Sequence, residues 1–168
     1  MNKLPVILGI DPGLDGGLCL MSPNGILPPL ILGTIPIPTL PGDKRLIDLP
    51  LLRQQILDYA PDIVILEQVG SMPGQGVTSM FSFGYSFGAI QGLLVGLQIP
   101  VRLVRPQEWQ RVAFKGIPAT LNKPSTLLAP RLWPSVDWRK SARSRLPHDG
   151  MTDAAGIGYW YIVSSTRT

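Results

Sequence analysis

Short apolar runs that stop at a turn occur five times along the chain, and each predicts a β-strand. The first, Pro-Val-Ile-Leu-Gly-Ile, stops at Asp11-Pro12-Gly13, which is typical of a buried strand closed by a turn. The second follows so closely that the two strands should pair as a hairpin. Pro36 and Pro38 place the end of the third strand at a sheet edge. We expect strands at residues 5–10, 16–21, 30–37, 63–66 and 101–104.

Apolar residues at helical spacing fill the segments between and after these strands. In residues 48–59, Leu52 and Ile56 recur on one side of a helix that Pro61 would stop. Strands that alternate with helices predict an α/β fold with a mixed sheet flanked by helices. The chain shows no repeat or linker that would divide it, so we expect residues 1–168 to form a single domain. We expect further helices at 78–98, 107–114 and 123–133, then a basic loop at 135–147 and a last helix from near Pro147 to near Val163.

The helix expected at 78–98 is long and apolar enough to raise the alternative of a membrane span. No charged residue occurs between Glu67 and Arg102, and glycine recurs every fourth residue, a pattern that closely packed membrane helices use. Serine and glutamine dilute the apolar run, however, and its ends lack aromatic and basic anchors. We therefore expect no membrane partner, and a helix packed closely on the sheet, on another helix or across a dimer axis. The four glycines are Gly84, Gly88, Gly92 and Gly96.

Composition narrows the class of protein further. Hydrophobic residues make up 45% of the chain and charged residues 15%, which excludes a wholly disordered chain. The one cysteine, Cys19, excludes a disulfide framework and a cysteine-rich zinc site, and its apolar neighbours predict a small buried side chain. The first residues resemble neither a signal peptide nor a transit peptide, so we expect a cytoplasmic protein.

Basic residues are concentrated in the last part of the chain. Residues 101–168 hold 11 basic and four acidic residues, a net charge of +7, whereas residues 1–100 carry a net charge of −3. A basic region of this kind is typical of a protein that binds a polyanion such as DNA, and also of a plain solvated surface. Charge alone leaves both interpretations open.

Four carboxylates stand where an α/β sheet collects its ligand-binding and catalytic groups. Asp11 and Glu67 each end an apolar strand, and Asp149 and Asp153 lie one turn apart on the same side of the last helix. Such oxygen ligands favour Mg²⁺ or Mn²⁺, and two ions held by shared carboxylates would hydrolyse a phosphodiester. The alternative is that the four side chains never meet, and that the acids at the helix start only interact with the helix dipole.

Four segments of the chain also form a recognisable series. They are Gly9-Ile10-Asp11-Pro12-Gly13, then Glu67-Gln68 with Phe83-Gly84-Tyr85, then Val104-Arg105-Pro106-Gln107-Glu108-Trp109, and last His148-Asp149-Gly150-Met151-Thr152-Asp153. In this order they resemble the motifs of RuvC-like Holliday junction resolvases, a family with the ribonuclease H-like fold. The match is closer to bacterial relatives of the plastid (monokaryotic chloroplast) resolvase, and it spans about residues 7–161.

The resemblance implies a structure-selective DNA endonuclease that resolves four-way (Holliday) junctions as a nucleoid-associated homodimer. It also implies two Mg²⁺ or Mn²⁺ ions per active site, with Asp11 bridging both, Glu67 binding one and Asp153 the other. The fourth position stays open between His148 and Asp149, because the alignment can slide by one residue. A carboxylate suits Mg²⁺ better than imidazole does, so we favour Asp149 as the ligand and expect His148 to act on the attacking water or the leaving oxygen.

Candidate DNA contacts lie in the loop at 70–80, expected near the junction centre, and among the basic residues near the last motifs. They are Gln75, Lys115, Lys123, Arg139, Lys140, Arg143 and Arg145. The aromatic residues expected mostly in the core are Phe81, Phe83, Phe87, Trp109, Trp133 and Trp160, although a phenylalanine nearest the loop would be placed to wedge into a junction. Two other functions stay open: another ribonuclease H-like nuclease, acting on RNA–DNA hybrids or damaged DNA, and a non-catalytic protein that binds DNA structures.

Overall fold

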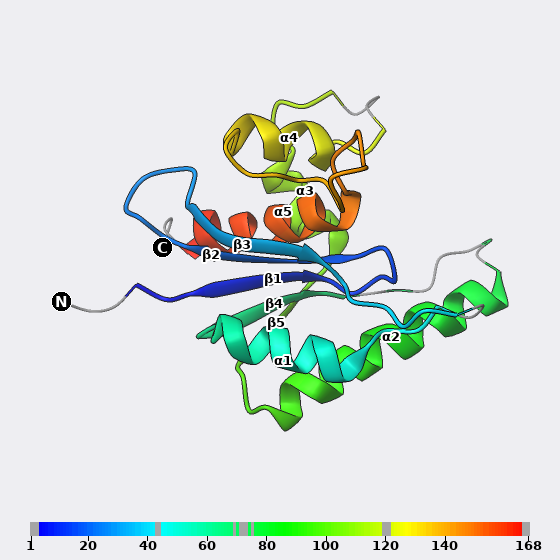
Figure 1. Ribbon diagram of the computed structural model, residues 1–168. Coiled ribbons are helices and arrows are strands. Elements are labelled where there is room, and N and C mark those ends of the chain that lie inside the picture. Colours follow the sequence, from blue (N-terminus) through cyan, green and yellow to red (C-terminus); the bar gives the residue numbers. More distant parts are fainter. Residues whose placement is uncertain are drawn as a thin grey trace.

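Five strands form one mixed sheet with the order β3-β2-β1-β4-β5 (Figure 1). The computed structural model describes residues 4–42, 45–68, 70, 74, 76–118 and 122–165. Strands β1, β2 and β3 pair antiparallel, and β1, β4 and β5 pair parallel, so the carboxyl ends of three strands meet at one edge. The strands are β1 (Ile7–Asp11), β2 (Gly17–Ser22), β3 (Leu30–Pro36), β4 (Ile63–Glu67) and β5 (Val101–Val104).

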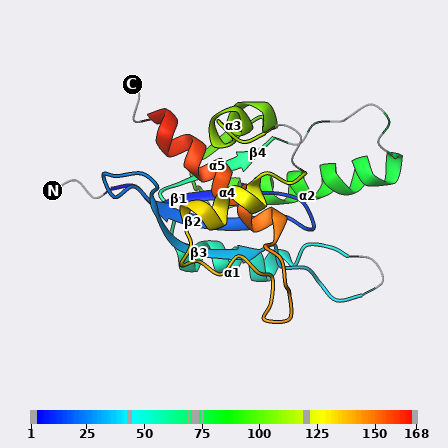
Figure 2. The same cartoon turned by 90° about the horizontal axis from the view of Figure 1, so that it is seen from above.

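Helices cover both faces of this sheet. Figure 1 shows α1 and α2 on one face and α3, α4 and α5 on the other, and Figure 2 shows the second group from above. The expected mixed sheet flanked by helices is confirmed, and each expected element is present with ends shifted by a few residues. The helices are α1 (Leu49–Tyr59), α2 (Val77–Gly96), α3 (Pro106–Ala113), α4 (Ser125–Leu132) and α5 (Asp149–Ser165).

Because side chains alternate across a strand, each face of the sheet has its own apolar cluster. On the α5 face, Ile7, Cys19 and Ile65 pack with the three tryptophans that the sequence assigns to the core. The exposed fraction of each of these tryptophans is 7% or less, so that expectation is confirmed, as is the burial of Cys19. On the other face, Leu8 and Leu66 are among the strand residues that pack against α1 and α2.

Helix α5 lies very close to β1 and β2, because glycines remove the side chains between them. A Cβ added at Gly9 would lie 2.1 Å from the carbonyl oxygen of Ala154, and one added at Gly17 would lie 2.6 Å from the backbone of Gly150. Such distances are far below van der Waals contact, so no larger residue fits at either strand position without moving the helix. This contact fixes the start of α5 against the turn between β1 and β2.

Helix α2 differs from its sequence-based expectation. Only Ser86, Ile90 and Leu94 are buried, and a Cβ added at any glycine of the expected stripe would meet nothing within 4 Å. The stripe is therefore not packed on the sheet or on another described helix of this chain. Phe81 and Phe83 are 77% and 40% exposed, so they do not belong to the core, whereas Phe87 packs partly buried against it.

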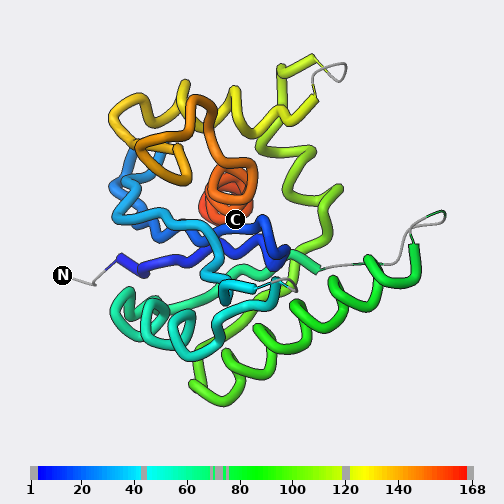
Figure 3. Tube along the Cα trace, turned by 45° about the vertical axis from the view of Figure 1, so that its right-hand side comes forward, coloured from blue at the N-terminus to red at the C-terminus, as the bar shows by residue number. Residues whose placement is uncertain are grey.

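The position of α2 explains why so much of it is exposed. Its amino-terminal half extends past the edge where β1 and β4 end, so the sheet covers only the other half (Figure 3). Within the part of the chain that the structure describes, no helix combines the length and apolarity needed to cross a bilayer.

Candidate active site

The register of the sheet brings Asp11 and Glu67 together. Strands β1 and β4 are parallel with Ile10 opposite Leu66, so the two carboxylates that follow lie side by side at the carboxyl edge. The Asp11 Oδ1 accepts a hydrogen bond from the Gly13 N–H at 3.3 Å. Burial, followed by the nearby charges of Glu67 and Asp153, raises the pKa of Asp11 to about 8. A buried carboxylate whose main charged neighbours are other carboxylates is a position that suits a cation.

Asp153 completes this group from above the sheet. The tight packing of α5 on β1 places it near Asp11, and burial raises the pKa of Asp153 to about 6. A hydrogen bond with the Ser125 hydroxyl opposes that rise. The Thr152 hydroxyl in turn lies 3.1 Å from the Ser125 Oγ, and both of these side chains are buried. Helix α4 thus supplies a neutral donor to the carboxylate of α5.

Glu67 is held in a comparable way by α3. The Trp109 Nε1–H donates to the Glu67 Oε1 at 2.7 Å. Burial is the largest effect on the pKa of Glu67 and raises it, whereas this hydrogen bond lowers it. From the sequence, Trp109 is expected mostly in the core, and this contact is not predicted. The sequence does hold a sign of this contact. A buried indole N–H needs a hydrogen-bond acceptor, and few polar residues at strand ends could be that acceptor.

Asp149 is brought to the same region but has a charged partner. It forms an ion pair with Lys123, and its side chain remains 37% exposed. A hydrogen bond with Asp149 raises the pKa of Lys123. Among the described residues, no three His, Cys, Asp or Glu side chains stand close enough to hold one ion in this conformation.

The donor set nevertheless fits a hard divalent cation. Asp11, Glu67 and Asp153 are carboxylates on three elements, and the hydrogen bonds that they accept come from neutral groups rather than from Lys or Arg. Burial and mutual repulsion raise the pKa of Asp11, which is the effect expected where close carboxylates lack a compensating cation.

His148 occupies the position just before α5. Its carbonyl oxygen accepts from the Thr152 N–H at 3.1 Å, and its Nδ1 accepts from the Met151 N–H at 3.4 Å. Burial, and then the charge of Lys140, lower the pKa of His148. In this structure His148 therefore caps the helix as a neutral imidazole, which is the structural role available to a polar residue at a helix start.

Two cavities open beside the carboxylates. One, of about 630 Å³, is lined by Asp11, Glu67 and Asp149 together with Ser82 and Phe83 from the exposed half of α2. The other, of about 450 Å³, is lined by Gln110 of α3 and by Phe114, Lys123, Asp149 and Asp153.

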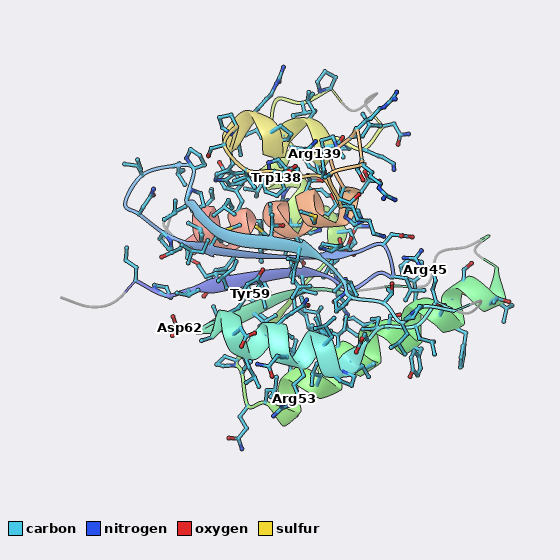
Figure 4. The ribbon with its side chains drawn as sticks, viewed as in Figure 1. Arg45, Arg53, Tyr59, Asp62, Trp138 and Arg139 are labelled. Atoms are coloured by element: carbon cyan, nitrogen blue, oxygen red, sulfur yellow. The ribbon has the colours of Figure 1, made fainter. Side chains whose placement is uncertain are left out.

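Asp15 also lines the larger cavity, and it is paired with Arg45. The Arg45 guanidinium donates to both Asp15 carboxylate oxygens, at 2.9 and 3.2 Å, and to the Leu14 carbonyl oxygen at 2.8 Å. Figure 4 shows Arg45 at the end of the sheet where β1 and β4 stop, and Asp62 at the opposite end. The sequence gives no sign of this contact, because 30 residues separate the two partners.

The predicted DNA contacts divide into three groups. Lys115, Arg143 and Arg145 are exposed, and Lys140 lies close enough to His148 and Asp15 to affect the pKa of both. Lys123 and Arg139 are exposed but ion-paired, Lys123 with Asp149 and Arg139 with Asp137 at 2.8 Å (Arg139 is labelled in Figure 4). Gln75 lies outside the described residues.

Comparison with known proteins gives matches in structure but not in sequence. No protein-family model and no curated protein matches the chain. RuvC of T. thermophilus, in a complex with a Holliday junction substrate, is 16% identical with a TM-score of 0.69, over 97% of this chain and 96% of that one. The yeast mitochondrial Holliday junction resolvase Ydc2 is 16% identical with a TM-score of 0.61, over 99% of this chain and 82% of that one.

A viral protein is also similar to this chain in fold. The fowlpox virus resolvase, in a complex with Holliday junction DNA, is 17% identical with a TM-score of 0.54, over 95% of this chain and 98% of that one. These matches extend over nearly the whole chain, as did the resemblance of its motifs. The chain therefore has the fold of RuvC and other Holliday junction resolvases, and the expected ribonuclease H-like architecture is confirmed.

Proposed function

We propose that this chain is a structure-selective DNA endonuclease that resolves four-way junctions, with residues 1–168 forming one nuclease domain. One observation carries the proposal: Asp11, Glu67 and Asp153 lie near enough to interact electrostatically at the carboxyl edge of a sheet whose fold is shared with proteins solved on Holliday junction DNA. Their separation along the sequence means that only the tertiary structure assembles them, and a chance cluster of buried carboxylates would be costly to maintain.

In this proposal Asp11, Glu67 and Asp153 would hold two Mg²⁺ or Mn²⁺ ions. When bound, such ions activate a water for attack on the scissile phosphate and stabilise the leaving oxygen. Asp149 would be the fourth ligand, and its ion pair with Lys123 would have to break before it could bind a metal ion. Lys123 is then free to contact a DNA phosphate.

The exposed basic residues support DNA as the substrate. Lys140 faces the region of His148 and Asp15, at the side of the carboxylate group, and Arg143 and Arg145 follow it in the loop before α5. Phosphate contacts of this kind give affinity and position rather than base specificity. They therefore suit an enzyme that selects the shape of a junction.

We also propose a homodimer with α2 at its interface. This helix has no charged residue, its glycine face is open, and Val77, Phe81, Tyr85 and Val95 are at least half exposed. A second copy of the chain is the occupant that fits, because a four-way junction has two-fold symmetry and paired nicks need two active sites related by that symmetry. Symmetric nicks would leave 5′-phosphate ends that can be ligated.

The test is cutting of a synthetic four-way junction in Mg²⁺, beside linear duplex and RNA–DNA hybrid controls. We expect cutting of the junction with Mg²⁺ or Mn²⁺ and none with Ca²⁺. Glu67→Gln and Asp153→Asn should abolish cutting while junction binding survives. Equal cutting of linear duplex or of the hybrid would indicate another nuclease of this fold, and binding without cutting in every metal would indicate a non-catalytic DNA-binding protein.

A further inference from the structure

Trp109 makes a contact that links α3 to the carboxylate group. Its Nε1–H donates to the Glu67 Oε1 at 2.7 Å across a sequence separation of 42 residues, and its exposed fraction is 1%. An indole has one donor and no acceptor, so this bond satisfies its whole hydrogen-bonding capacity. The bond ends on one oxygen of Glu67, and the other carboxylate oxygen has no protein hydrogen bond among the described contacts.

The indole ring is fixed on its other sides by packing. Its centroid lies 5.2 Å from that of Phe114, with the two rings inclined by 69° in an edge-to-face contact. On α5, a Cβ added at Gly156 would lie 2.7 Å from the Trp109 Cζ3, so only glycine leaves room for the ring there. Gly156 comes three residues after Asp153 on the same helix, so one rigid ring touches the helix that carries Asp153 and bonds to Glu67.

The two ways in which carboxylates are held here have different consequences. Asp149 is held by the charged Lys123, which competes with a cation for the same oxygens. The neutral indole N–H fixes the rotamer of Glu67 and brings no positive charge that would repel a metal ion. Partners that orient a metal ligand from behind in this way affect both metal affinity and rate.

We infer that Trp109 is a positioning residue for Glu67, holding the carboxylate in the orientation that binds the metal ion. The role of Trp109 in catalysis rests on the proposed function, whereas its effect on metal binding does not. The competing explanation is that Trp109 is only a packed core residue whose N–H needs some acceptor. The two explanations differ in what removal of the N–H alone should change.

The chain offers a matched control. Trp133 is also buried, at 6% exposed, and its Nε1–H donates at 2.7 Å to the Pro29 carbonyl oxygen, which is not one of the candidate ligands. Trp109→Phe and Trp133→Phe therefore remove the same donor from the same kind of environment, and each keeps an aromatic ring in the core. Any effect of losing a buried indole in general appears in both variants.

The experiment measures Mn²⁺ affinity by titration calorimetry and single-turnover junction cutting for the wild type and both variants. For Trp109→Phe we expect Mn²⁺ binding and the cutting rate each to fall by roughly 10–100-fold, with the junction Kd within about twofold of the wild type. Trp133→Phe should keep Mn²⁺ affinity and rate. Wild-type values in Trp109→Phe, or equal losses in the two variants, would overturn the inference.

A second measurement tests the bond itself in the folded protein. Among the four indole N–H resonances expected from the four tryptophans, the one missing in Trp109→Phe should move in Glu67→Gln and on addition of Mg²⁺ to the wild type. A resonance that ignores both changes counts against the inference. A wild type that binds Mn²⁺ but cuts no junction would overturn the proposed function alone, and one that binds no Mn²⁺ would overturn both.

Discussion

Replacing Asp11 with asparagine should stabilise the metal-free protein at neutral pH and abolish DNA cutting. The pKa of Asp11 is raised from 3.8 to about 8 by burial and by neighbouring carboxylates. Because the folded pKa lies above the unfolded one, the unfolded chain releases its proton first as the pH rises. The free energy of unfolding therefore decreases between about pH 4 and pH 8 and levels off above that range.

The size of the effect follows from the two pKa values. At pH 7 the difference corresponds to at most about 4 kcal/mol of lost stability. Asparagine has the shape of the protonated acid, and its carbonyl oxygen can still accept the Gly13 N–H, so it avoids this loss. We expect a gain of about 2 to 4 kcal/mol, which raises the Tm of a domain of this size by about 4 °C or more.

The assay is thermal unfolding in EDTA at pH 5, 7 and 8, with Asp58→Asn as the control. Asp58 is an exposed carboxylate, and its replacement should change the Tm little at any of these pH values. The advantage of Asp11→Asn should shrink at pH 5, and saturating Mg²⁺ should stabilise the wild type but not the variant. A variant with the wild-type Tm at pH 7, or an advantage that does not change with pH, would refute the reasoning.

Three further predictions test other parts of the structure. Asp149→Asn should reduce the single-turnover cutting rate more than His148→Ala does. His148→Ala should mainly cost about 1 kcal/mol of stability through loss of the α5 cap. The reverse order of rates would place His148 in the fourth position. Gly88→Ala should stabilise the chain by about 1 kcal/mol, since the added Cβ meets nothing within the chain. Gly88→Glu should convert the dimer to monomers, as measured by light scattering. A Gly88→Glu protein that remains a dimer would exclude this face as the interface. Gly9→Ala should cost about 3 kcal/mol in chemical denaturation, because its Cβ would lie 2.1 Å from the Ala154 oxygen, and an unchanged midpoint would contradict the close packing of α5 on β1.

Local patterns in the sequence predicted the elements and their order. A strand repeats every two residues and a helix every 3.6, so the apolar runs at β1 and β4 and the spacing in α1 could be recognised without tertiary information. Turn and proline signals gave most element ends within a few residues. The same patterns placed Asp11 and Glu67 at strand ends, because a charged residue directly after a buried run must stand at its edge.

The glycine motifs are only partly explained by the sequence. Glycine at positions 9, 17 and 150 indicates a backbone constraint, but the packed helix shows that the constraint is the approach of α5 to β1 and β2. The stripe along α2 predicted close packing either on the sheet or across a dimer axis. The first alternative is wrong, and the second stays a prediction. A repeating face shows which residues point the same way, and it does not show what covers them.

Contacts between distant segments were decided by the tertiary structure alone. The register of β1 against β4 places Asp11 beside Glu67, and the packing of α3 against α5 brings Trp109 to the latter carboxylate. The pairing of Lys123 with Asp149 likewise joins residues that no local pattern relates. Periodicity determines how neighbours along the chain are arranged, whereas these contacts depend on how whole elements pack, and that is settled by the shape and burial of many side chains together.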